Sequence, residues 1–113
     1  MAFDEQLDRR ISRIVRRRKG VTTKKMFGGV AFLSWGNMFC GVVGEDFMVR
    51  VGPDGYEEAL SEPHVREMDF TGRPMKGMIY VSPRGTRSDD DLQTWIEKGL
   101  AFARSLPRKD SDK

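Results

Sequence analysis

Residues 38–51 read MFCGVVGEDFMVRV, and this stretch decides the fold. Met38 to Val43 is a mostly apolar run typical of a buried strand. Phe47 to Val51 alternates apolar residues with Met48 and Arg50, as a half-exposed strand does. The Gly-Glu-Asp between the two runs has the composition of a turn. The stretch therefore predicts two neighbouring antiparallel strands.

Working outward from this pair, three further strands are predicted. Val30 to Leu33 precedes a turn cluster and completes an antiparallel meander. Thr22 to Phe27 could begin this first strand, although the two glycines that follow weaken or bend it. Val65 to Phe70 is a weak edge strand, and Met78 to Val81 is rich in residues that favour strands.

Helices are predicted at both ends of this strand region and between its two parts. The first carries an apolar stripe at helical spacing, with acidic residues early, basic residues late and Gly20 as its stop. Tyr56 to Leu60 is a short helix. The last helix begins at Ser88 as its cap, with negative charge in its first turn. The two apolar faces comprise Phe3, Leu7, Ile11, Ile14 and Val15, and Leu92, Trp95, Ile96, Gly99, Leu100, Ala103 and Leu106.

These elements predict an α+β fold with two layers: a mainly antiparallel five-stranded sheet with helices on one side, in the order α-β-β-β-α-β-β-α. Residues 1–106 are expected to form a single domain and residues 107–113 a disordered tail. The predicted core includes Ile11, Phe39, Val49, Tyr80, Trp95 and Leu100.

Composition limits the setting of the protein. A length of 113 residues suits one domain. No apolar run approaches the roughly 20 residues of a membrane span, so no membrane association is expected. The first residues lack the basic start and apolar run of a secretory signal. Cys40 is the only cysteine and has no internal partner, which fits the reducing cytoplasm.

Positive charge is concentrated at the start of the chain. Residues 1–25 contain nine Lys/Arg and three Asp/Glu, whereas the remaining residues contain eleven and fourteen. A helical arc of arginines could contact phosphates, or it could be an ordinary solvated face. The segment lacks interleaved aromatics, which disfavours reading of bases. The arc consists of Arg9, Arg10, Arg13, Arg16 and Arg17.

No pattern of catalytic, metal or cofactor residues is visible. His64 is the only histidine, and Cys40 lies among apolar neighbours, where a thiol is usually inert. Neither G-x-x-x-x-G-K-[ST] nor G-x-G-x-x-G occurs. Residues 89–91, three aspartates, are better explained by helix capping than by cation binding. We therefore expect no catalytic residue, no metal site, no cofactor and no enzymatic activity.

One motif carries a family resemblance. Met26-Phe27-Gly28-Gly29, the hairpin that follows and the loop with Lys76 before Met78 resemble the TfoX N-terminal domain family. The similarity covers roughly Asp8 to Leu106. It implies a two-layer α+β fold and no established catalytic residues. In longer members this domain precedes a second one, in regulators of competence development that assist a DNA-binding transcription factor.

The chain departs from those longer members because it ends soon after the last helix, which leaves the competence role open. Some members carry a methyltransferase label, but no cofactor-binding glycine motif supports one here.

Three hypotheses for function follow. The first is a non-catalytic interaction or regulatory module that acts through contacts with a protein partner of unknown identity, with a homodimer possible. The second is a weak, nonspecific nucleic-acid-binding protein using the arginine-rich first helix. The third is a small enzyme acting near Lys76 and Cys40. The candidate partner surface is Arg9, Arg13, Arg16, Arg17, Arg73 and Lys76.

Overall fold

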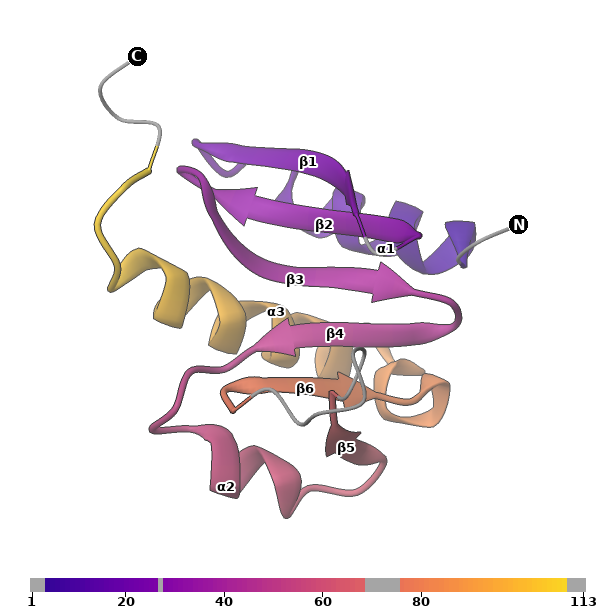
Figure 1. Ribbon diagram of the computed structural model, residues 1–113. Coiled ribbons are helices and arrows are strands. Elements are labelled where there is room, and N and C mark those ends of the chain that lie inside the picture. The colour runs from indigo at the N-terminus through magenta and orange to yellow at the C-terminus, as the bar shows by residue number, and fades with distance from the viewer. Residues whose placement is uncertain (1–3, 27, 69–75, 110–113) are drawn as a thin grey trace.

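The computed structural model describes residues 4–26, 28–68 and 76–109. Among these residues one antiparallel sheet has the strand order β1-β2-β3-β4-β6-β5. Figure 1 shows α1 and α3 on the same face of this sheet, with α2 beside its β5 edge. The elements are α1 (Glu5–Val15), β1 (Val21–Met26), β2 (Gly29–Ser34), β3 (Asn37–Val43), β4 (Asp46–Arg50), α2 (Tyr56–Leu60), β5 (Val65–Glu67), β6 (Met78–Val81), the 3-10 turn η1 (Pro83–Thr86) and α3 (Asp89–Arg104).

The predicted α+β class and the helices on one side are confirmed, but the sheet has six strands where the sequence predicted five. The additional strand is β1, which pairs with β2 along its whole length from Val21 opposite Ser34 to Met26 opposite Gly29. Thr22 to Lys25 are exposed on both faces. Because these side chains show no apolar alternation, the sequence gives little sign of a separate strand, and backbone pairing holds it in place.

A bulge in β3 brings the sheet close to α3. Phe32 pairs with Cys40 and Leu33 pairs with Met38, so Phe39 is an extra residue in β3. A side chain at Gly99 of α3 would put its Cβ 2.4 Å from the Phe39 carbonyl oxygen. Glycine is therefore required at position 99 for α3 to pack this closely on the sheet.

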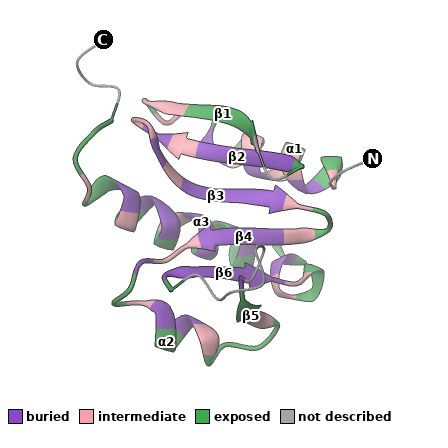
Figure 2. Ribbon diagram, viewed as in Figure 1, coloured by how far each residue is buried: buried purple, intermediate pink, exposed green. Residues whose placement is uncertain are grey.

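The main core lies between the sheet and the helices, and Figure 2 shows the central strands as largely buried. It joins residues of α1, the sheet and α3, including Ile11, Phe39, Val49 and Leu100, each 0% exposed. Trp95 is 7% exposed and belongs to the same cluster. The predicted core residues are thus confirmed as buried, although Tyr80 lies elsewhere.

Tyr80 packs in a second, smaller cluster with Met48, Met68 and Met78. In the antiparallel pairing Tyr80 lies opposite Met48, whereas Val49 lies opposite Ile79. Neighbouring residues of a strand point to opposite faces. The methionine cluster therefore covers part of the face that α1 and α3 leave free.

Both long helices begin with a side-chain cap, and the predicted cap at Ser88 is confirmed. Asp4 Oδ1 accepts the backbone N–H groups of Gln6 at 3.0 Å and Leu7 at 3.2 Å. Ser88 Oγ accepts the N–H of Asp91 at 3.0 Å. Each bond satisfies a donor that the first turn of a helix leaves free. Among the described residues, no helix is both long and apolar enough to cross a membrane.

Candidate functional site

The α1 arginines divide into exposed and engaged residues. Arg9, Arg13, Arg16 and Arg17 are exposed. Arg18 is half-buried and forms a two-pronged ion pair with Glu97 of α3, with Nη1 donating to Oε1 at 3.3 Å and Nη2 to Oε2. This hydrogen bond is the main reason that the pKa of the Glu97 carboxyl is lowered and that of Arg18 is raised.

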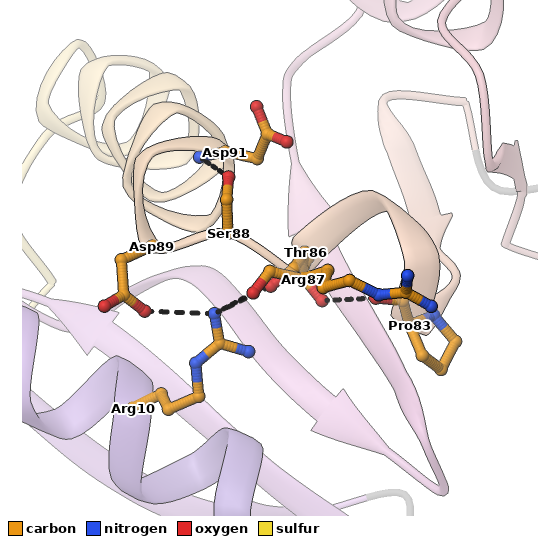
Figure 3. A network of polar contacts seen from close by, with 7 residues as sticks. All are labelled: Arg10, Pro83, Thr86, Arg87, Ser88, Asp89 and Asp91. Atoms are coloured by element: carbon orange, nitrogen blue, oxygen red, sulfur yellow. Dashed lines mark hydrogen bonds and ion pairs between the residues drawn. The ribbon is translucent and has the colours of Figure 1, made fainter.

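Arg10 is held by the protein itself and does not belong to the free arginine arc predicted from the sequence. Its Nη2 donates to the carbonyl oxygens of Thr86 at 2.7 Å and Arg87 at 3.3 Å, and to Asp89 Oδ1 at 3.1 Å. Figure 3 shows this guanidinium reaching from α1 to η1 and the start of α3. Arg10 therefore joins α1 to two elements far from it in the sequence, η1 and the start of α3.

The family motif begins at the last residue of β1, Met26, and ends at the first residue of β2, Gly29. Gly28 has a φ of +74°, the left-handed region that glycine adopts without strain. A Cβ at Gly29 would lie 1.9 Å from the Val42 carbonyl oxygen of β3. These two glycines thus have a structural role in closing the hairpin against the neighbouring strand. The side chain of Met26 and all of Phe27 lie outside the described residues.

Cys40 is 0% exposed in the main core, and burial raises the pKa of its thiol well above the ordinary value. A neutral, enclosed thiol is a poor nucleophile. The described residues contain no group of three or more His, Cys, Asp or Glu side chains that could hold a metal ion. Lys76 is exposed before β6, and Cys40 is buried in the main core, so the two do not line a common hollow among the described residues. Arg73 is outside the described residues.

An apolar groove lies between α2 and α3, with a volume of about 350 Å³. We call it the α2–α3 groove. Val51, Ala59, Ala101 and Phe102 give it an apolar lining, and three charged side chains also line it. These charged residues are Glu58, Glu62 and Lys98.

Phe102 also lines a second hollow, of about 290 Å³, that includes Arg50 and Lys76. A third hollow, of about 270 Å³, includes Arg104 and Arg108. We call these four residues the cationic end, because they lie where β4 and α3 end and where β6 begins. The guanidinium of Arg50 is 5.2 Å from the centre of the Phe102 ring.

Trp35 occupies the turn between β2 and β3 at this end. Its φ of 51° is unusual for a bulky residue, and Gly36 follows with a φ of 87°. The guanidinium of Arg108 lies 4.0 Å from the centre of the indole. Gly20 lies so close to the indole that a Cβ there would be 2.3 Å from it.

The segment after α3 is bonded to the same turn. Asn37 Nδ2 donates to the Pro107 carbonyl at 2.8 Å, and the N–H of Lys109 donates to the Trp35 carbonyl at 2.9 Å. Part of the predicted tail, residues 107–109, is therefore held against the sheet, and residues 110–113 lie outside the described part. These bonds fix the backbone on both sides of Arg108.

Comparison with protein families gives a match between residues 13–103 and the TfoX N-terminal domain, which is most of the chain. The chain belongs to the TfoX N-terminal domain family. This family is associated with competence regulation. No curated protein and no solved structure matches the chain.

Within this TfoX N-terminal domain, the match includes the glycine motif, Lys76 and Trp35 but ends before Arg104 and Arg108. Half of the cationic end therefore lies beyond the matched residues. Sequence reasoning found Lys76 and missed Arg50, Arg104 and Arg108, because these arginines come from separate segments. The only available signal was the charge of the residues after α3, which was assigned to a disordered tail.

Proposed function

We propose that this chain is a non-catalytic regulatory module that acts through contacts with another protein. The observation that supports it best is the α2–α3 groove, with its apolar lining beside charged side chains. Protein interfaces combine an apolar centre with a polar rim in this way. The regulatory part of the proposal comes from membership of a family associated with competence regulation.

The groove is better suited to a partner's side chains than to catalysis. Its carboxylates, Glu58 and Glu62, are exposed, whereas catalytic acids and bases usually converge in a site that excludes water. Ala101 is an exposed residue of α3 in this groove. The proposal also locates the module in the cytoplasm, in keeping with the free thiol of Cys40.

The test is capture of a partner from nuclease-treated extract of the native cells, using wild type and Ala101→Arg. Arginine is a good helix former, so this change fills the groove without disturbing α3. Thr94→Arg, an exposed position nearer the start of α3, is the matched control. We expect Ala101→Arg to lose a protein that Thr94→Arg retains. A partner retained equally by both variants would refute the groove as the contact surface.

Nonspecific nucleic-acid binding is the second candidate, and the exposure of Arg9, Arg13, Arg16 and Arg17 on and after α1 favours it. Contacts to phosphates alone predict weak binding that is lost between about 50 and 200 mM salt. The triple variant R13E/R16E/R17E should abolish this binding and leave the fold intact. Tight binding at the higher salt would reverse the order of the two candidates.

A further inference from the structure

The cationic end differs from the other hollows of the described surface in the charges that line it. Its two hollows contain two cationic side chains each and no Asp or Glu among the described residues. Three other hollows each include carboxylates: Glu58 and Glu62, Asp4 and Glu45, and Asp90 and Glu97. An anionic group is thus attracted to the cationic end, because no described carboxylate lines its two hollows.

The cations at this end form no ion pair with a described residue. Arg104 helps to lower the pKa of Glu97, but that carboxylate is already bonded to Arg18. The ion pairs among the described residues use Arg10, Arg18 and Arg66, and none uses a residue of the cationic end. Arg50 and Arg108 lie over aromatic rings. A guanidinium stacked in this way still presents the N–H groups at its edge, the geometry that binds a carboxylate through two parallel hydrogen bonds.

The Trp35 turn provides a rigid support for Arg108. A bulky residue at positive φ is strained, and such positions persist only where the surroundings enforce them. Here Gly20 packs against the indole, and the backbone bonds of Pro107 and Lys109 hold the segment that carries Arg108. The arginine is therefore presented from a fixed position, which lowers the entropy lost on binding.

We propose that the cationic end binds an acidic, partly apolar segment of the partner protein. Carboxylates of this segment pair with the four cations. Its apolar side chains pack in the hollow that Arg50 and Lys76 line, against Met38, Met78 and Phe102. This inference rests on the proposed function, because it names the chemistry of the same protein partner, and the shared Phe102 makes the α2–α3 groove continuous with this surface.

A peptide fits this surface better than a nucleic acid does. Met38 and Met78 in the hollow with Arg50 and Lys76 form an adaptable apolar surface, which suits aliphatic and aromatic side chains. A phosphate backbone makes no favourable contact with such a surface. Single-stranded nucleic acids are commonly held by stacking of bases on aromatic rings. Arg108 already covers a face of the Trp35 indole, so that ring is not open on this side to a base.

The experiment measures fluorescence anisotropy of a labelled peptide of repeated Glu-Glu-Leu-Phe with the full chain. The comparison probes are the same peptide with Lys for Glu, a poly-Glu peptide of equal length, and oligo(dT). The test variant is R50Q/R108Q, and the matched control is R13Q/R17Q, which removes two exposed charges elsewhere. Thermal unfolding of each variant establishes that it is folded.

We expect the Glu-Glu-Leu-Phe peptide to bind more tightly than poly-Glu, and the Lys peptide not to bind. R50Q/R108Q should weaken the binding about tenfold or more, and R13Q/R17Q less than about twofold. Equal weakening by both variants, or tighter binding of oligo(dT), would overturn the proposal. So would self-association of the chain that R50Q/R108Q abolishes while peptide binding is absent, since the occupant would then be a second copy.

Partner capture separates this inference from the proposed function. If the captured partner is lost with Ala101→Arg and kept with R50Q/R108Q, the proposed function stands and the acidic segment is wrong. A partner lost with both variants supports the proposed function and the acidic segment. If no partner depends on either variant, the proposed function itself fails, whatever the peptide does.

Discussion

Where β3 turns into β4, arginines are bonded to carbonyls and carboxylates of the protein. At the opposite end of the sheet, Arg50, Arg104 and Arg108 form no ion pair with a described residue. Arg10 links α1 to η1 and α3, and Arg66 Nη2 lies 2.6 Å from Asp46 Oδ2 at the start of β4. Arg66 also lies over the Tyr80 ring, as Arg50 and Arg108 lie over Phe102 and Trp35, but of these three only Arg66 has an ion pair among the described residues. The same residue type thus stabilises the fold at one end and is available to a partner at the other.

Both ends of the sheet depend on α3, which runs from one to the other. Trp95 holds this helix in the main core, so its replacement should disturb both ends. Trp95→Ala should lower the free energy of unfolding by about 3–5 kcal/mol, because it deletes a large buried aromatic and leaves a cavity. Denaturant unfolding measures the loss. Thr94→Ala at the neighbouring exposed position should change stability by less than about 0.5 kcal/mol. A small loss for Trp95→Ala would show that α3 is not anchored there.

We call the end with Arg10, Arg66 and the β3–β4 turn the engaged end. Replacing Arg10 tests whether the arginines there stabilise the fold. Arg10→Ala should cost about 1–2 kcal/mol, because it removes charge-assisted hydrogen bonds to the carbonyl of the buried Thr86 and to Asp89. Arg13→Ala on the exposed side of α1 is the control and should fall within about 0.5 kcal/mol of wild type. Equal unfolding free energies for the two variants would mean that the Arg10 network adds nothing.

A smaller effect is expected from the Arg18–Glu97 pair, which lies between α3 and the connection from α1 to β1. The pKa of Glu97 is lowered in the folded protein, so the pair stabilises it above the ordinary carboxyl pKa near 4.5 and ceases to do so as pH falls through the lowered value. Partial exposure and solvent screening limit the gain to less than about 1 kcal/mol. The unfolding free energies of wild type and Glu97→Gln should therefore differ at pH 7 and converge as pH falls below 4.5 through the lowered pKa of Glu97. If the difference in unfolding free energy stayed the same at every pH, it would come from packing of Glu97 and not from its charge.

The sequence predicted those elements whose apolar residues recur at a regular period. α1, α3, β3 and β4 bury a face that the spacing of residues such as Ile11, Leu100 and Val49 already marks. β1 was not predicted as a separate strand because Thr22 to Lys25 are exposed on both faces. Pairing with β2 is what makes them a strand.

The candidate site was harder to predict for a related reason. The arginines on and just after α1 form a run that predicts a surface, yet Arg10 in that run is bonded within the fold. Arg50 and Arg108 are separated by more than half of the chain, and strand pairing and the close packing of α3 at Gly99 bring their segments to one end. Trp35 at positive φ contradicts the local rule that favours glycine or asparagine in such turns.

Docking of an acidic segment at the cationic end can be mapped by titrating the ¹⁵N-labelled protein with the Glu-Glu-Leu-Phe peptide and following the amide and indole shifts. We expect the largest changes at the Trp35 indole N–H, Arg50, Gly77, Phe102 and Arg108. Amides of Arg10, Asp46 and Thr86 at the engaged end should stay within the noise. Shifts centred on the exposed arginines of α1, with the Trp35 indole unmoved, would contradict it.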